Sequence, residues 1–131
     1  MRNAIQTSGY KMSTSTINLS DLNGTNGFTI NGIDAGDFSG VSVSSAGDVN
    51  GDGIDDLIIG AYGANPDGKS KAGESYVVYG SDTRSAAAFD LSDLNGTNGF
   101  IINGIDTGDF SGIPVSSAGD VNGDGIDDII I

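Results

Sequence analysis

The 131-residue sequence contains no cysteine and no histidine. Without cysteine, the chain can form neither a disulfide nor a thiolate site. Without histidine, imidazole bases, histidine-ligated zinc and Ser-His-Asp triads are excluded within this chain. The metal ligands that remain are hard oxygens, which argues against binding of transition metals.

Long apolar runs are also missing. No stretch reaches the 18 or so apolar residues that a membrane-spanning helix requires, so we expect no membrane insertion. Residues 1–20 are polar and show no basic-then-apolar pattern of a signal peptide. We expect the sequence to be a portion of a longer protein or a unit that closes by self-association.

Positive charge is scarce. Five lysines and arginines stand against 18 acidic residues, which gives a formal net charge of −13. Binding to nucleic acid or to anionic membranes needs clustered lysine and arginine, so these partners are not expected. Eight of the 18 acidic residues lie in two nine-residue segments, so much of the negative charge is concentrated there and indicates a specific role for these segments.

The two segments, residues 48–56 and 120–128, both read DVNGDGIDD and lie 72 positions apart. Oxygen side chains stand at positions 1, 3, 5 and 9, and a glycine at position 6 permits a sharp turn that brings the position-7 carbonyl inward. Calcium takes about 6–8 oxygen ligands, and a short loop of this pattern supplies them. We therefore predict two Ca²⁺ sites, one in each segment. Their predicted ligands are Asp48, Asn50, Asp52, the carbonyl of Ile54 and Asp56, and Asp120, Asn122, Asp124, the carbonyl of Ile126 and Asp128.

Other interpretations of these segments are open. A plain Asn-Gly or Asp-Gly hairpin turn needs no metal. However, two carboxylates about 4 Å apart repel by roughly 4 kcal/mol at an effective dielectric near 20, which favours a cation among three of them. EF-hand and dockerin loops place their last carboxylate at position 12, where this chain has Ile59 and Ile131. A toxin-type β-roll would need tandem nonapeptides, and the sequence has none.

For the other acidic residues we favour structural roles. Asp55 and Asp127, at position 8 of the segments, are expected to be solvated neighbours of the ligands. Residues 34–37 and 106–109 are expected to form polar turns between strands, with a second cation site as the alternative. Paired aspartates could act as acid and base in glycoside hydrolysis, but carboxylates that hold calcium stay ionised, so we expect no catalysis.

Tyr62, Tyr76 and Tyr79 could contribute to a surface that contacts a sugar or a peptide. We expect them instead in the strand core or at the blade rim.

The whole chain is organised around an internal repeat. Residues 19–59 and 91–131 align over 41 positions and differ at only five, one of which is Ser42 against Pro114. We expect Pro114 inside a strand, where the missing amide would leave a bulge or an unpaired position. Self-similarity at a fixed period indicates a solenoid, a propeller or an array, in which each unit completes its core against a neighbour.

The strand signals predict an all-β fold of β-propeller blades, each with four antiparallel strands. One complete blade is expected, with strands near 40–45, 56–61, 75–80 and 99–104, and the apolar segment 57–59 as its central strand. The chain supplies about two blade-equivalents, which is an incomplete ring. The predicted organisation is a polar tail (1–16), an outer-strand segment of a preceding blade (17–37), a complete blade (38–105) and the first half of a second blade (106–131).

The sequence resembles the FG-GAP repeat, the blade of the integrin α-subunit propeller, which also occurs in bacterial secreted and surface proteins and in glycosylphosphatidylinositol-specific phospholipase D. The matching residues are Ser39–Val43, Gly47–Asp56, Gly60–Tyr62 and Tyr76–Gly80. The sequence departs from the pattern twice: Phe38 stands one position early, and Tyr62 replaces a proline. The resemblance implies calcium at the ligands named above.

The resemblance further implies a non-enzymatic, extracellular or cell-surface module for binding or adhesion, whose partner would be an unknown protein or glycan. Two alternatives are an accessory propeller of a larger secreted enzyme and a structural repeat that self-assembles through open blade edges.

Overall fold

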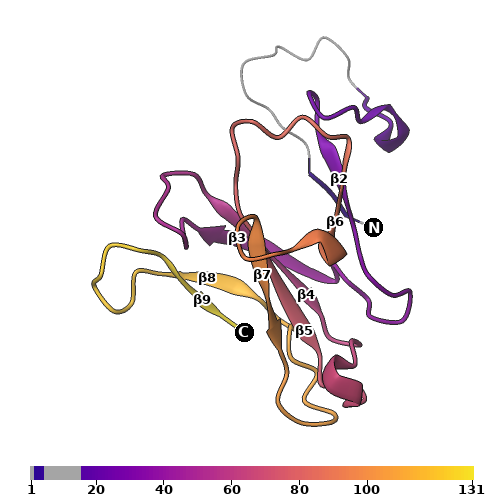
Figure 1. Ribbon diagram of the computed structural model, residues 1–131, viewed down its shortest axis with the longest axis vertical. Helices are drawn as coiled ribbons and strands as arrows, with labels where there is room; N and C mark the ends of the chain where they lie inside the picture. Colours follow the sequence, from indigo (N-terminus) through magenta and orange to yellow (C-terminus); the bar gives the residue numbers. More distant parts are fainter. Residues whose placement is uncertain (1, 5–15) are drawn as a thin grey trace.

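The computed structural model describes residues 2–4 and 16–131 of the chain (Figure 1). The described part is all-β, as predicted, and helix is limited to short 3-10 turns. The strands are β1 (Arg2–Ala4), β2 (Phe28–Asn31), β3 (Ser42–Gly47), β4 (Asp56–Ala61), β5 (Glu74–Val78), β6 (Ala88–Asp90), β7 (Gly99–Asn103), β8 (Ser116–Gly119) and β9 (Asp128–Ile130). The 3-10 turns are Leu19–Asp21, Pro66–Gly68 and Leu91–Asp93.

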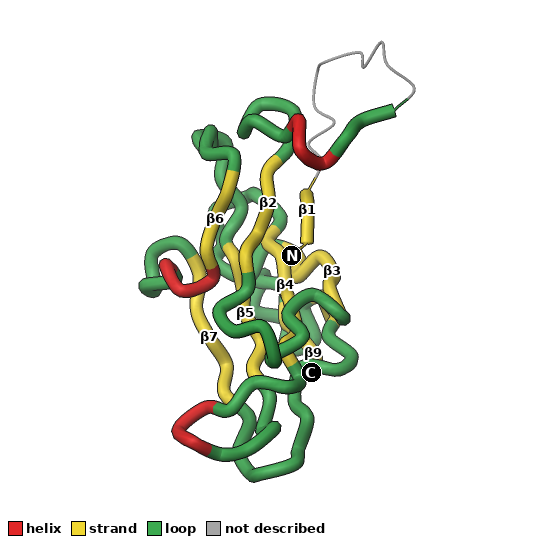
Figure 2. The backbone as a smooth tube through the Cα atoms, turned by 90° about the vertical axis from the view of Figure 1, so that its right-hand side faces the viewer, coloured by secondary structure: helices red, strands yellow, loops and turns green. Residues whose placement is uncertain are grey.

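The largest sheet is the predicted blade. Its strand order is β3-β4-β5-β7, and each neighbouring pair is antiparallel. All four strands fall within about two residues of the predicted ranges. Strand β4 lies inside the sheet and buries both of its faces, since Ile58 and Ile59 are 0% and 3% exposed. Figure 2 shows these strands separated by long loops, as the many Gly, Asn and Asp residues lead us to expect.

Two smaller sheets flank the blade. One has the order β1-β2-β6, and the other pairs β8 with β9. Strand β2 occupies the position predicted for an outer strand of a preceding blade, but it pairs in parallel with β6. Strand β6 lies between the third and fourth predicted strands of the blade, where the sequence analysis predicts no strand.

The apolar core is divided between the two faces of the blade. On one face, Ile59 and Tyr76 pack with Ile30 of β2 and with Leu91. On the other, Ile58 and Val77 pack with Val115, which precedes β8. Because side chains alternate along a strand, neighbouring residues of β4 and β5 serve opposite faces. The central sheet therefore buries its two faces against the segments before and after it, as the repeat predicts.

The prediction for Pro114 was wrong. Pro114 precedes β8, which begins at Ser116. The next amide, that of Val115, donates a hydrogen bond of 2.9 Å to Ser42 Oγ of the central blade. A register shift does occur in β8, between Ser117 and Gly119, but β3 has the equivalent shift without a proline. The bulge therefore belongs to the shared repeat.

The two departures from the FG-GAP pattern pack against each other. The rings of Phe38 and Tyr62 are stacked, with centroids 5.3 Å apart and planes 8° from parallel. Phe110, the repeat equivalent of Phe38, approaches the same tyrosine at 6.4 Å. Tyr62 thus lies at the rim between the two blades, as predicted, while Tyr76 is fully buried in the core.

Part of the predicted polar tail over residues 1–16 lies outside the described residues, and within that range Arg2–Ala4 form β1. In the part of the chain that the structure describes, no helix combines the length and apolarity needed to cross a membrane.

Candidate metal-binding loops

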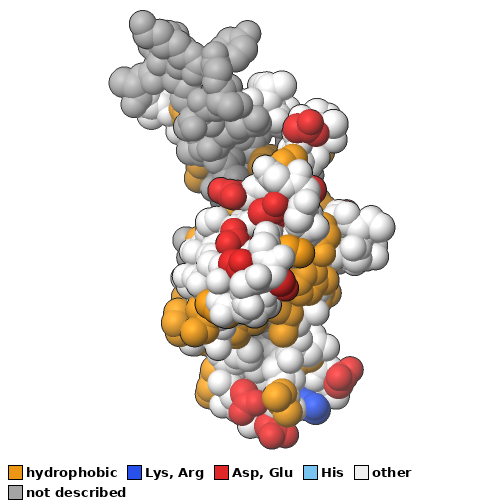
Figure 3. Space-filling model, turned by 90° about the vertical axis from the view of Figure 1, so that its left-hand side faces the viewer, with side chains coloured by type: hydrophobic (Ala, Val, Ile, Leu, Met, Phe, Trp, Pro, Cys, Tyr) orange, Lys and Arg blue, Asp and Glu red, His pale blue; other side chains and the backbone are white. Residues whose placement is uncertain are grey.

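The two acidic segments form the loops that join β3 to β4 and β8 to β9. Both loops project toward the same side of the molecule (Figure 1). Figure 3 views that side and shows carboxylate groups gathered across the middle of the face. The structure thus places the ten predicted ligands in two neighbouring loops, five in each.

The position-1 aspartate organises each loop. Asp48 Oδ1 accepts hydrogen bonds from the amides of Gly51 (2.7 Å) and Asp52 (3.0 Å), and Oδ2 accepts one from Gly53 (2.8 Å). These amide donors, that of Gly53 first, hold the pKa of the Asp48 carboxyl below its ordinary value. The side chain is therefore ionised and faces a tightly turned backbone.

The second loop repeats this arrangement. Asp120 accepts hydrogen bonds from the amides of Gly123, Asp124 and Gly125 at 2.7, 3.1 and 2.9 Å. The same donors, that of Gly125 first, lower the pKa of Asp120. The conformation of the loop thus follows from the repeated sequence, and both copies adopt it.

Positions 3 and 5 are joined by local bonds. Asn50 Oδ1 accepts the amide of Asp52 at 2.8 Å, and Asp52 Oδ1 accepts the amide of Ile54 at 2.8 Å. Asn122 and Asp124 make the equivalent bonds at 2.9 and 3.0 Å. The position-5 aspartates are exposed, so their carboxylates can reach a cation from solvent.

The position-9 aspartates close the loops, and the two copies differ there. Asp56 is 1% exposed and accepts amides from Val49 (3.0 Å) and Gly80 (2.7 Å). Burial raises its pKa, the two amides oppose this, and the charges of Asp52 and Asp48 raise it further. Asp128 is half-buried and accepts the amide of Val121 at 2.8 Å.

The side chains do not stand in a finished coordination shell. Among the residues the structure describes, no three acidic side chains are gathered closely enough to hold a metal ion. Many of their oxygen atoms accept hydrogen bonds from backbone amides, as in a loop whose turns are stabilised by its own side chains. The composition of the donor set fits calcium, because it combines carboxylates, an amide oxygen and a backbone carbonyl. Binding would require Asp52 and its neighbours to turn inward.

Gly80 matches the FG-GAP pattern, but sequence reasoning missed its contact with the first loop. Its amide reaches Asp56 from the segment that leaves β5, 24 residues along the chain. A Cβ at Gly80 would overlap the Ile54 side chain, so only glycine fits between this segment and the first loop. The motif itself gave no signal for this contact.

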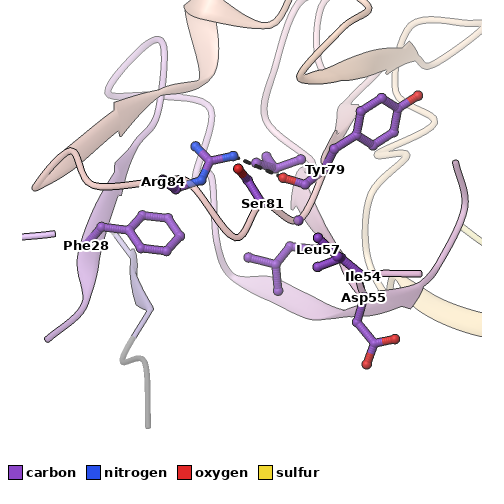
Figure 4. A pocket seen from close by; sticks show the side chains of 9 residues that line it. Phe28, Ile54, Asp55, Leu57, Tyr79, Ser81 and Arg84 are labelled. Atoms are coloured by element: carbon purple, nitrogen blue, oxygen red, sulfur yellow. Dashed lines mark hydrogen bonds between the residues drawn. The ribbon is translucent and has the colours of Figure 1, made fainter. Parts of the chain in front are cut away.

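A cavity of about 260 Å³ lies beside the first loop (Figure 4). Arg84 lies at its edge, donates a hydrogen bond of 3.0 Å to the Tyr79 carbonyl, and covers the rings of Phe28 and Phe89 at 5.4 and 4.6 Å. These contacts attach the segment after β5 to β2 and β6. Arg84 therefore holds in place the segment after β5, and Gly80 of that segment contacts the first loop.

Asp127 is also not the solvated neighbour that was predicted. Its Oδ2 accepts the amide of Asp48 at 3.0 Å, and its own amide donates to the Asp48 carbonyl at 3.2 Å. The second loop therefore contacts the first ligand position of the first loop directly. Asp55, at the equivalent position of the first loop, is exposed as predicted.

The comparison with family models finds a match over residues 39–78, which contain the first loop, β3, β4 and β5, to the FG-GAP repeat. This confirms the resemblance drawn from the motif. Neither the curated proteins nor the solved structures include a significant match to the chain. The FG-GAP repeat and the four-stranded sheet together indicate a propeller-type module.

Proposed function

We propose that the loops at residues 48–56 and 120–128 each bind one calcium ion, within a non-enzymatic extracellular module for binding or adhesion. The observation that carries this proposal is the first loop's charge arrangement. Burial disfavours ionisation of Asp56, and the charges of Asp52 and Asp48 add to that effect. A divalent cation would remove that repulsion by accepting all three carboxylates.

The residues that would hold the ion are the ten predicted ligands. Asp48 and Asp120 are already ionised and fixed by backbone amides, so they would serve as preorganised anchors. Asp52 and Asp124 are exposed, so their side chains would turn toward an ion without disturbing packed neighbours. When bound, the ion supplies only electrostatic cross-linking of each turn.

The extracellular and non-enzymatic parts of the proposal rest on chemistry. Calcium loops of extracellular modules bind with dissociation constants on the order of 10⁻⁴–10⁻³ M, which suits a setting with millimolar calcium. Carboxylates committed to a cation remain ionised and are poor general acids. The partner of such a module would be a protein or a glycan.

Calorimetric titration of the full chain with calcium tests the site assignment. The unmodified chain should show two binding events. Asp52→Ala should remove the event at the first loop and Asp124→Ala the event at the second, because each removes a carboxylate from position 5. Asp55→Ala is the matched control, since Asp55 is an exposed aspartate of the same loop and is not a proposed ligand.

Two undiminished events in Asp52→Ala would contradict the ligand assignment. No binding by the unmodified chain at millimolar calcium would overturn the proposed function.

A further inference from the structure

The two loops are joined across the boundary between the blades by a reciprocal pair of hydrogen bonds. Asp127 Oδ2 accepts the Asp48 amide at 3.0 Å, and the Asp127 amide donates to the Asp48 carbonyl at 3.2 Å. The two residues are 79 positions apart. The side chain of Ile126 also reaches toward Gly51 of the first loop. The junction therefore involves backbone as well as side-chain atoms.

Each partner in this pair is tied to a proposed ligand. Asp48 is position 1 of the first loop, and its backbone is held on both sides by Asp127. In the second loop, the Asp127 amide shares a planar peptide unit with the Ile126 carbonyl, the proposed position-7 ligand. The N–H and C=O of a trans peptide point in opposite directions, so the bond to Asp48 turns the Ile126 carbonyl away from the first loop.

Gly47 shows how close this junction is. Its φ is +73°, and a Cβ at this position would overlap the Asp127 carboxylate. Gly119, the repeat equivalent, has a similar φ of +68° but has open space where its Cβ would be. The glycine at position 47 is therefore needed both for the turn and for the approach of Asp127.

From this geometry we infer that Asp127 is a positioning residue that couples the two calcium sites, so that filling either loop raises the affinity of the other. The inference rests on the proposed calcium function. An ion in the second loop would fix the Ile126–Asp127 peptide and with it the Asp48 backbone. The reverse holds for an ion in the first loop, because coupling between two binding sites is reciprocal.

The size of the effect follows from the contact. A net hydrogen bond contributes about 0.5–1.5 kcal/mol, so one bond of this kind corresponds to a coupling of roughly two- to tenfold in affinity. The Asp55 carboxylate has no equivalent bond among the described residues, which makes it a matched control within the same chain.

The test is a cycle of calcium titrations on the full chain. The affinity of the first loop is measured with the second loop intact and with Asp124→Ala. In the otherwise unmodified chain, loss of the second site should weaken the first by about two- to tenfold. In Asp127→Ala, which removes the side-chain bond and keeps the backbone bond, the same comparison should give a smaller ratio. Asp127→Asn keeps an oxygen that can accept the Asp48 amide and should retain the coupling, as should Asp55→Ala.

A spectroscopic signature accompanies the cycle. In Asp52→Ala, where calcium can occupy only the second loop, titration should shift the amide resonance of Asp48. The shift should be smaller in the Asp52→Ala, Asp127→Ala double variant, which lacks the side-chain bond. A role of Asp127 in stability alone would change the melting temperature without changing the coupling ratio.

The outcomes separate the inference from the proposed function. Absence of calcium binding in the unmodified chain overturns both. Two sites with no coupling, or a coupling ratio that Asp127→Ala leaves unchanged, overturn the inference and leave the calcium sites standing. Loss of coupling in Asp127→Asn as well as in Asp127→Ala overturns the role given to the hydrogen bond.

Discussion

Asp37 shows how one residue type acquires different properties at equivalent positions of the repeat. Asp37 and Asp109 occupy the same place in the turns at 34–37 and 106–109, and both turns close with an amide-to-carbonyl bond of 3.2 Å. Asp37 is 6% exposed, whereas Asp109 is exposed. Burial raises the pKa of Asp37, and a backbone hydrogen bond with Asp34 offsets part of that effect. Equivalent positions of the repeat therefore acquire different surroundings when the neighbouring segments differ.

Asp37→Asn should change the pH dependence of stability. Because the pKa of Asp37 is raised above its ordinary value of 3.8, the folded protein binds this proton more tightly than the unfolded chain. The stabilisation is fully present below pH 3.8 and is lost as the pH rises through the folded pKa. The unmodified, calcium-free chain should therefore lose stability relative to Asp37→Asn over that range, as measured by urea unfolding at a series of pH values.

The control for this experiment is Asp109→Asn, which removes the same group from an exposed turn. The loss of stability with rising pH that is attributed to Asp37 should persist in Asp109→Asn. If the curve of Asp37→Asn ran parallel to that of the unmodified chain, burial of Asp37 would have no titration consequence, and the pKa argument would be wrong.

The strands could be predicted because their signals are local. The alternation at 40–44, the apolar run at 57–59 and the β-branched and aromatic run at 75–79 each identify a strand without reference to any other segment. The metal-type loops could be predicted for the same reason, since all five proposed ligands of a loop lie within nine residues. The turn of each loop is then formed by its own position-1 aspartate.

The contacts between elements could not be predicted from these patterns. The parallel pairing of β2 with β6 joins residues 59 positions apart, and the bond from Gly80 to Asp56 comes from another segment. Asp127 reads as a polar loop residue because its partner lies in the preceding blade. Where a residue's role depends on the approach of another blade, a single repeat does not contain the information.

Gly47→Ala tests the junction between elements. At both Gly47 and Gly119 an alanine would adopt a positive φ, at a cost of order 1–3 kcal/mol. Only at Gly47 would the new Cβ also displace Asp127 from the Asp48 amide, which costs about 1 kcal/mol more. Gly47→Ala should therefore lower the free energy of unfolding by more than Gly119→Ala does, as measured by urea denaturation. Equal losses would show that the contact between the loops contributes nothing to stability.

At the scale of the whole molecule, the distribution of charge is the main feature. The net charge is −13, and eight of the 18 acids belong to two loops that touch each other. Most of the apolar core lies on the two faces of the central sheet, and Val49 of the first loop packs against one of its clusters. The hydrophobic interior therefore stabilises the blade, while the carboxylates on the acidic side of the molecule repel one another. This repulsion makes the stability of the fold sensitive to cations.

Calcium removal should consequently lower the melting temperature of the full chain. Calcium at ten times the dissociation constant stabilises the folded state by about 1.4 kcal/mol per site, and two such sites would raise the melting temperature by roughly ten degrees. Melts followed by circular dichroism in millimolar calcium and in chelator, at matched ionic strength, measure this difference. The Asp52→Ala, Asp124→Ala double variant should melt at the same temperature in both buffers, because it lacks a position-5 carboxylate in each loop. If the unmodified chain also melted identically in calcium and in chelator, the loops would be turns held by their own amides, with no structural metal.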